Sequence, residues 1–214
     1  MSKYSTSMKI HDTTWDEEFQ RYIKSPEEFE AVNSNTTKEL LNEACVSFKE
    51  FLSSLPLDIG KYDFIDFGSG VGDITSELKH KFKKIYSVEP SESGIKLQKE
   101  RFRNDTNIEI IQAYGEDFLD NFKPNNPVIF WTGTVLLHIP TDVVKRILER
   151  VNNFPEYSAI NLSELYTRFF ARESRMHYAR TKRFYKNELS TYNVKFLNTK
   201  TIIRFQRKGI HAYK

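Results

Sequence analysis

The chain has 214 residues, of which 39% are hydrophobic and 14% aromatic, so it can bury one good core but is short for two full domains. No apolar run approaches the roughly 18 residues of a membrane span, and the first residues contain no apolar signal segment. These features predict a soluble cytoplasmic protein with no membrane partner. The single cysteine, Cys45, cannot form an intramolecular disulfide, and we expect a buried thiol in a reducing compartment.

The formal net charge is only +3, but it is unevenly distributed. Residues 165–214 contain thirteen lysines and arginines against two acids, whereas residues 1–35 contain four basic and seven acidic side chains. The positive field is therefore expected over the C-terminal quarter.

The first 58 residues are predicted to form a helical cap or lid segment. A capping-box pattern at Thr36–Glu39 precedes apolar residues at helical spacing from Leu40 to Leu55, and Pro56 ends the helix. Upstream, the aromatic residues between His11 and Tyr22 are spaced for one face of a short helix. That helix either packs on the domain or acts as a lid over a bound ligand.

From Tyr62 onward, strand and helix signals alternate, which predicts a parallel sheet covered on both faces. The expected strands are 64–67, 85–88, 108–111, 128–131 and 159–162. Helices are expected through Ile74, Leu78 and Phe82, from Ser91 to Phe102, and from a cap at Thr141 to Val151. The tail between 194 and 213 alternates enough for two more strands around 207–209.

The run Gly68-Ser69-Gly70-Val71-Gly72 follows the first strand and can open a helix. Alternate glycines allow a tight turn and close approach of the backbone to a ligand, which is typical of a nucleoside-cofactor loop. A dinucleotide fingerprint would place its third glycine at position 73, where this chain has Asp73, and the Gly-Lys-Ser/Thr ending of a P-loop is also absent.

With Asp66 on the preceding strand, this run resembles motif I of the class I S-adenosylmethionine-dependent methyltransferases. The resemblance implies a Rossmann-like α/β fold, with a mostly parallel seven-stranded sheet in the order 3-2-1-4-5-7-6 and helices on both faces. It implies one domain, in which residues 62–214 form the core and an acceptor-binding insertion lies near 165–185. S-adenosylmethionine is then the cofactor, S-adenosylhomocysteine its product, and no metal is expected. The implied cofactor residues in this segment are Asp66, Gly68, Ser69, Gly70 and Gly72.

Glu89 ends the second strand, 21 residues after Gly68. An acidic side chain there can accept hydrogen bonds from both hydroxyls of a ribose, at the edge where ligands lie in such sheets. The alternative is a charge placed at the start of the next helix. In the family, the matching acid binds the ribose, so Glu89, with the adjoining Pro90, is a predicted cofactor contact.

The segment from Gln112 to Phe118 resembles the family's G-D-A-x-D-L motif beside adenine, although Tyr114 stands where the acid is expected. Gly115, Glu116 and Asp117 are therefore the candidate adenine contacts. A solvated helix cap is the alternative for the two acids.

The segment from Phe130 to Pro140 resembles the family segment that ends in L-H-H-I-P, which is common in methyltransferases of small molecules; Pro127 replaces the acid that usually opens the strand. Trp131 and Thr132 are expected between the methionine end of the cofactor and the acceptor. His138 is either a packing residue of the turn or a catalytic base, and Glu164 is the second candidate base. The Asn/Asp-Pro-Pro-Tyr/Phe run of exocyclic-amine methyltransferases and the Pro-Cys nucleophile of cytosine-carbon methyltransferases are absent.

The stretch 166–185, after the fifth strand, is both basic and aromatic. Arginine can bind phosphate or carboxylate through paired donors, which favours an anionic acceptor such as a phosphorylated or acidic sugar. The alternative is a helix with a solvated basic face and a buried aromatic face. The candidate acceptor contacts are Trp15, Tyr22, Arg168, Arg172, Arg175, His177 and Tyr178.

Three functions stay open at this level. The first is methyl transfer to an oxygen or nitrogen of a small molecule or glycan precursor. The second is methylation of RNA or protein through the basic C-terminal region. The third is a cofactor-binding subunit without activity, in which Tyr114 and Pro127 reflect lost catalysis.

Overall fold

The computed structural model describes residues 16–17, 20, 48–133, 135–164, 166–167, 172–173, 178–196 and 208–214. Most of the predicted N-terminal cap, including the capping box and Cys45, lies outside the described residues. Residues 48–53 are helical, as predicted for the end of the second N-terminal helix.

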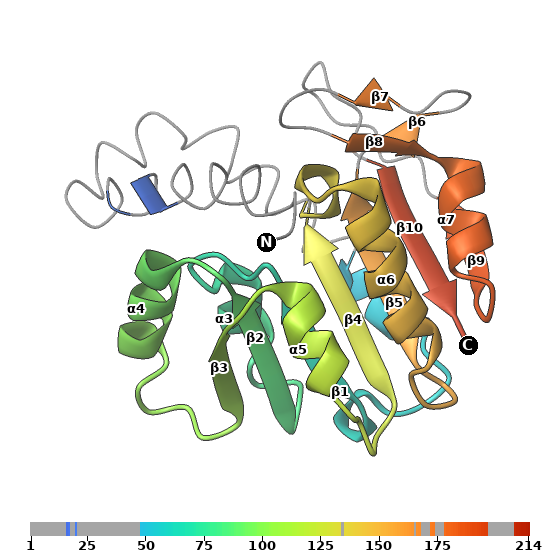
Figure 1. The fold of residues 1–214 in the computed structure, drawn as a ribbon. Coiled ribbons are helices and arrows are strands. Elements are labelled where there is room, and N and C mark those ends of the chain that lie inside the picture. The colour runs from blue at the N-terminus through green and yellow to red at the C-terminus, as the bar shows by residue number, and fades with distance from the viewer. Residues whose placement is uncertain are drawn as a thin grey trace.

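A seven-stranded sheet runs through the molecule in the order β3-β2-β1-β4-β5-β10-β9 (Figure 1). The pairs β1–β2, β1–β4, β2–β3 and β4–β5 are parallel, whereas β10 is antiparallel to both β5 and β9. Since β9 and β10 are the sixth and seventh strands of this sheet, the predicted order 3-2-1-4-5-7-6 is confirmed. The strands are β1 (Asp63–Phe67), β2 (Lys84–Glu89), β3 (Ile108–Gln112), β4 (Val128–Gly133), β5 (Ala159–Glu164), β9 (Asn193–Phe196) and β10 (Lys208–Tyr213).

Three short strands form a separate small sheet between β5 and β9, in the order β6-β8-β7. They are β6 (Tyr166–Thr167), β7 (Arg172–Glu173) and β8 (Tyr178–Thr181), and in Figure 1 they lie beyond the end of the large sheet, next to α7 (Lys182–Glu188). The acceptor-binding insertion near 165–185 stays a prediction, and these strands lie in that part of the chain. The described part of 166–185 is mainly strand followed by a short helix, so the alternative of one continuous helix is wrong.

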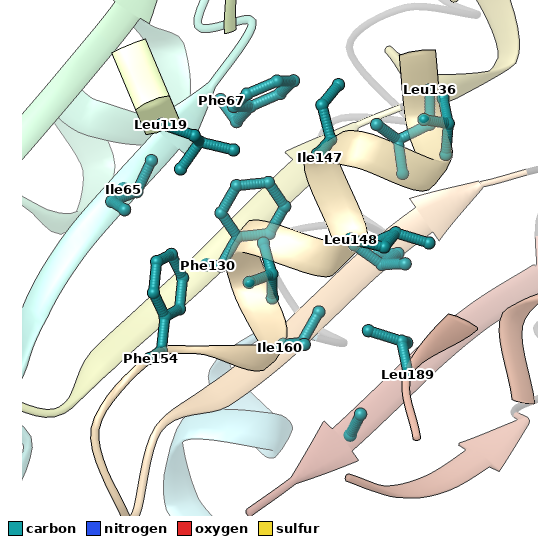
Figure 2. Close-up of a cluster of buried hydrophobic side chains, with 14 of the residues drawn as sticks. Ile65, Phe67, Leu119, Phe130, Leu136, Ile147, Leu148, Phe154, Ile160 and Leu189 are labelled. Carbon is teal, nitrogen blue, oxygen red and sulfur yellow. The ribbon is translucent and has the colours of Figure 1, made fainter. Parts of the chain in front are cut away.

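One face of the sheet packs against α5 (Gly115–Asn121), α6 (Thr141–Asn152) and α7. Val143, Val144, Ile147, Leu148 and Val151 recur every three or four residues along α6, which places them all on its buried side. In Figure 2 the α6 side chains Ile147 and Leu148 and the α5 side chain Leu119 meet residues of β1, β4 and β5. Burying a side chain of this size contributes about 1.5–3 kcal/mol, so this layer holds the strands at fixed relative positions.

The opposite face packs against residues 48–53 and α3 (Asp73–Leu78), with Phe48, Phe51, Phe64 and Phe82 in the same buried cluster. A row of register-paired polar and aromatic residues also crosses this face near the carboxyl ends of the parallel strands. It comprises Ser87, Asp66, Trp131, Asn161 and His211, all buried. Polar groups inside a core require partners, so this row identifies where the sheet departs from plain hydrophobic packing.

The remaining elements are η1 (Ile59–Lys61), α4 (Glu92–Arg101) and η2 (Leu136–His138). Three predicted boundaries are wrong. Helix α3 ends at Leu78, so Phe82 reaches the core from the connection to β2 rather than from the helix. Pro140, not Thr141, is the N-cap of α6. Positions 208 and 209 lie inside β10, paired with Glu164 and Ser163, because the antiparallel partner extends the strand past the expected turn.

Candidate active site

The glycine loop follows β1 and adopts a conformation that only glycine takes easily. Gly68, Gly70 and Gly72 have φ values of 71°, 57° and 81°, in the left-handed region. The N–H groups of Gly68 and Ser69 both donate to the Val88 carbonyl oxygen, at 2.9 and 3.1 Å, which turns the chain across the end of β2. Gly72 is the N-cap of α3, so the loop opens a helix as predicted.

Two of these glycines also make close contacts. A Cβ on Gly68 would lie 2.4 Å from Val135 Cγ2, and a Cβ on Gly72 would lie 2.6 Å from the Phe102 ring. The loop therefore packs directly against the segment that follows β4 on one side and the end of α4 on the other. The contact with Val135 brings two sequence motifs together at one edge of the sheet, the carboxyl edge where ligands bind in doubly wound folds.

Glu89 is 6% exposed and holds the loop from the end of β2. Its Oε2 accepts a hydrogen bond from the Gly70 N–H at 2.9 Å, and its Oε1 accepts one from the Ser91 N–H at 3.0 Å. A carboxylate has about four acceptor sites, so a residue of this type can serve the loop and a ligand from the same position. The structure thus brings the predicted acid and the glycine loop into direct contact, with Pro90 half-buried beside them.

Gln98 is a functional support that sequence reasoning missed. Its Nε2 donates to Ser69 Oγ at 2.8 Å and to the Gly70 carbonyl at 2.7 Å, while its Oε1 accepts from Ser87 Oγ at 2.7 Å. The available signal was a polar residue one turn after Gly94 and Ile95, on the buried side of α4. These hydrogen bonds of Gln98 hold the part of the loop that faces Glu89 in one conformation.

Asp66 is fully buried beneath the loop rather than on its surface. Its Oδ2 accepts from the Thr75 N–H at 3.1 Å and from Thr75 Oγ1 at 2.6 Å, whereas its Oδ1 has no partner among the described residues. Burial raises the pKa of Asp66 from 3.8 to about 7, against the lowering effect of the Thr75 bonds. Asp66 therefore ties β1 to α3 in this structure.

The three predicted adenine contacts, Gly115, Glu116 and Asp117, form the first turn of α5. Gly115 is needed for packing, since a Cβ there would lie 1.9 Å from the Phe67 ring. Glu116 is half-buried, its Oε2 has no partner among the described residues, and burial raises its pKa above the usual range. Asp117 is exposed in the same first turn.

Trp131 and Thr132 end β4 on opposite faces of the sheet. Trp131 is 6% exposed, its ring centroid lies 6.1 Å from that of Phe48, and its Nε1 has no partner among the described residues. Thr132 is fully buried and its hydroxyl donates to Glu164 Oε1 at 3.2 Å. Only Trp131 thus faces the same side of the sheet as Asp66.

The two candidate bases lie close in the fold but in different surroundings. His138 is half-buried at the end of η2. Glu164 is 0% exposed at the end of β5, and both its oxygens accept hydrogen bonds from the chain around η2. A general base must come within hydrogen-bond reach of the acceptor proton, so the half-buried His138 is the better placed of the two predicted bases in this structure.

The acceptor residues are described only in part. Tyr178 is half-buried on β8, and Arg172 lies on β7, paired in register with Ala179. Trp15, Tyr22, Arg168, Arg175 and His177 lie outside the described residues. Asp16, which adjoins Trp15 in the sequence, is described: its Oδ1 accepts from Ser91 Oγ at 2.6 Å and from the Ser93 N–H at 3.1 Å, so Asp16 contacts the start of α4.

Neither a metal site nor a membrane span is found in the described part of the chain. There, no three His, Cys, Asp or Glu side chains are grouped as metal ligands would be. Among the same residues, no helix combines the length and apolar character needed to cross a bilayer.

The buried polar atoms that lack partners support a ligand at this edge of the sheet. Among the described residues, three such atoms belong to predicted cofactor contacts: Asp66 Oδ1, Glu116 Oε2 and Trp131 Nε1. Buried polar groups without partners are rare in folded proteins and indicate groups reserved for a ligand or water. The residues present therefore fit a polar nucleoside cofactor.

Residues 65–153, which span the glycine loop, Glu89 and the β4–α6 segment, match the model of a family described as a methyltransferase domain. This match supports a methyltransferase domain in that part of the chain. No curated protein matches the chain in sequence.

Solved structures share the methyltransferase fold at low sequence identity. A SAM-dependent methyltransferase from Leishmania major is 16% identical with a TM-score of 0.67, covering 94% of this chain and 82% of its own. The 1,6-didemethyltoxoflavin-N1-methyltransferase of Burkholderia thailandensis is 10% identical with a TM-score of 0.66, covering 92% and 86%. Phosphoethanolamine N-methyltransferase 1 of Haemonchus contortus is 16% identical with a TM-score of 0.65, covering 96% of this chain and 49% of its own.

Proposed function

We propose that this methyltransferase domain transfers a methyl group from S-adenosylmethionine to an oxygen or nitrogen of an anionic small molecule or glycan precursor. The observation that carries the cofactor site is the contact between Glu89 and Gly70. In this contact a carboxylate lies against the glycine turn, at the carboxyl edge of β1 and β2 where ligands bind in such sheets.

Each predicted cofactor residue receives a role consistent with its position. Glu89 and Pro90 bind the ribose, and the loop residues Gly68, Ser69, Gly70 and Gly72 surround the methionine part. Gly115, Glu116 and Asp117 lie on the adenine side. Trp131 lies toward the methyl group. Asp66 and Thr132 support the cofactor site from within the core, through their buried contacts with Thr75 and Glu164 respectively.

The bound cofactor supplies a methyl group already activated by the positive charge of its sulfonium. The protein therefore has to align the acceptor with the carbon–sulfur bond and exclude water. For a hydroxyl acceptor, His138 takes the proton at an imidazole nitrogen as the oxygen–carbon bond forms. For an amine acceptor, the site needs only to hold the neutral form.

The anionic character of the acceptor is inferred from charge. Thirteen Lys and Arg residues lie between 165 and 214, and Arg172 and Tyr178 belong to the small sheet that follows β5. Among proteins of this fold, the Haemonchus contortus enzyme binds phosphoethanolamine and the Burkholderia thailandensis enzyme binds 1,6-didemethyltoxoflavin, both small molecules. The same charge favours RNA or an acidic protein surface as the second candidate.

The cofactor role is tested by calorimetry with S-adenosylhomocysteine. Glu89→Ala is expected to weaken binding by about 1.5–3 kcal/mol, because hydrogen bonds to a charged group are lost. Glu92→Ala is the matched control, since Glu92 is an exposed acid on the first turn of α4 and should bind normally. Equal affinities for both variants would rule out the ribose role.

The acceptor is tested by S-adenosylhomocysteine formation with a panel of phosphoethanolamine, sugar phosphates, sugar acids and RNA. Product with the small anions supports the proposal. Product with RNA alone, falling steeply as salt rises, supports the second candidate instead. Cofactor binding without product from any member or from cell extract would favour the inactive subunit.

A further inference from the structure

The turn between β4 and α6 is held at its start by a buried carboxylate. Glu164 Oε1 accepts from the Leu136 N–H at 3.0 Å, and its Oε2 accepts from the Leu137 N–H at 3.1 Å. The first N–H groups of a helical turn have no partner within the turn, so the carboxylate satisfies donors that would otherwise be buried unpaired. Its hydrogen bond from Thr132 links the same carboxylate to the end of β4.

The other end of the turn is held by a buried guanidinium from the small sheet. Arg180, on β8, is 1% exposed and donates through Nη1 to the Leu136 carbonyl at 2.7 Å and through Nη2 to the Ile139 carbonyl. The planar fork of arginine bonds the two carbonyls from two nitrogens in a fixed geometry, whereas lysine would have to reach both from a single nitrogen on a flexible stem. The turn is therefore fixed by opposite charges at opposite ends, from β5 and from β8.

More polar groups are buried around Glu164 and Arg180 than a contact with a purely structural role would need. Arg180 Nε and the Tyr185 hydroxyl are both buried beside these two charges, and the two side chains interact with each other. Burial raises the pKa of Glu164 to about 7, while the amides of Leu136 and Leu137 and the charge of Arg180 act in the lowering direction. Tyr185 also interacts with both charges, and burial raises the pKa of its hydroxyl above the usual range.

The turn lies between the parts that methyl transfer requires. Val135, just before it, packs against Gly68 of the cofactor loop, and His138 ends it. Arg180 follows Tyr178 on the same strand of the insertion. A displacement of this turn would therefore change the relative position of cofactor, base and acceptor segment together, and misplacement by about 1 Å can reduce a rate about 100-fold.

We propose that Glu164 and Arg180 are positioning residues that fix the β4–α6 turn and couple the small sheet to the base side of the methyl-transfer site. This inference rests on the proposed function. It replaces the general-base role predicted for Glu164 with an indirect role through His138, and it gives Arg180 a role that its sequence context does not suggest.

The Glu164 contact is tested by ¹H–¹⁵N NMR of the full chain with and without S-adenosylhomocysteine. The Leu136 and Leu137 amide protons should move downfield together as Glu164 ionises near neutral pH, because a charged acceptor strengthens the bond. Glu164→Gln should abolish that common titration. Leu136 and Leu137 amide signals that Glu164→Gln leaves unchanged, or a common titration that persists in this variant, would overturn the inference.

The Arg180 contact is tested with Arg180→Lys, which keeps the charge and removes the fork. The turn amides and the His138 imidazole signals should shift while S-adenosylhomocysteine affinity stays within about twofold, since Glu89 and the glycine loop are untouched. Tyr192→Phe is the matched control: it removes a buried hydrogen bond to the Val151 carbonyl at the far end of α6. Unchanged turn signals in Arg180→Lys, or equal changes in the control, contradict a positioning role.

Kinetics separate this role from stability and from the proposed function. With an acceptor that gives product, Arg180→Lys should lower kcat about tenfold or more with KM for S-adenosylmethionine unchanged, whereas Tyr192→Phe should retain wild-type kcat. An unchanged kcat would overturn the inference. Loss of S-adenosylhomocysteine binding in the wild type would instead refute the proposed function while leaving the amide titration intact.

Discussion

Asp66→Asn should change how the stability of this protein depends on pH. The carboxyl of Asp66 is fully buried, and burial raises its pKa from 3.8 to about 7. Between these two values the folded state holds a proton that the unfolded state has released. The free energy of unfolding therefore falls as pH rises through this window, and the loss is complete above the folded pKa.

The magnitude follows from the shift. One pKa unit is worth about 1.4 kcal/mol, so a change from 3.8 to about 7 corresponds to a loss of roughly 4 kcal/mol at alkaline pH. Asparagine keeps the volume and one acceptor oxygen, which can retain the two bonds from Thr75, but it does not ionise. Its amide nitrogen takes the place of Oδ1, which has no partner among the described residues, at a cost of about 1–3 kcal/mol.

The assay is urea unfolding of both proteins at about pH 5 and about pH 8. Most of the pH range over which the ionisation of Asp66 lowers the free energy of unfolding lies between these two conditions. The stability of Asp66→Asn relative to the wild type should improve by about 2–3 kcal/mol between the two conditions. Glu164 is present in both proteins, so its own titration cancels. A relative stability that does not change with pH would refute the reasoning, because it would mean that Asp66 is ionised equally in both states.

Gly115→Ala should lower the free energy of unfolding by about 1–3 kcal/mol, because its Cβ would lie 1.9 Å from the Phe67 ring. The control is Gly60→Ala, where the nearest atom lies 3.5 Å away; equal urea midpoints for the two variants would exclude the clash. Trp131→Phe should weaken S-adenosylhomocysteine binding by about 0.5–1.5 kcal/mol in calorimetry, because the unpartnered indole N–H would lose a ligand contact. Wild-type affinity in that variant would show that this N–H meets no cofactor atom.

The parallel strands and the glycine loop could be predicted because their signals are local. Alternating apolar runs specify strands, and the positive φ angles of Gly68, Gly70 and Gly72 require glycine at those positions. The position of Glu89 beside the loop could be predicted from distance along the chain, since only a short helix and a strand separate them. Element ends were less accurate: Phe82 lies at a helical interval but is held in the core by its ring contact with Phe64, 4.8 Å between centroids.

The contacts that complete the site are long-range and have no local pattern. Gln98 supports Gly70 from 28 residues away, and Arg180 reaches Leu136 across 44. Glu164 looked like an available base because it ends a strand at the ligand edge, but burial and two backbone amides reserve it for the turn. Whether a polar side chain faces a ligand or the core depends on packing between distant elements.

The sequence by itself thus determined the α/β class, the glycine loop and the acid that follows the second strand, because backbone conformation and hydrophobic periodicity are encoded over short distances. Only the tertiary structure decided which polar groups lie under the loop and how the β4–α6 turn is held. Those depend on the register of β1, β2, β4 and β5 and on the return of β8 against η2, which bring together side chains that the sequence leaves far apart.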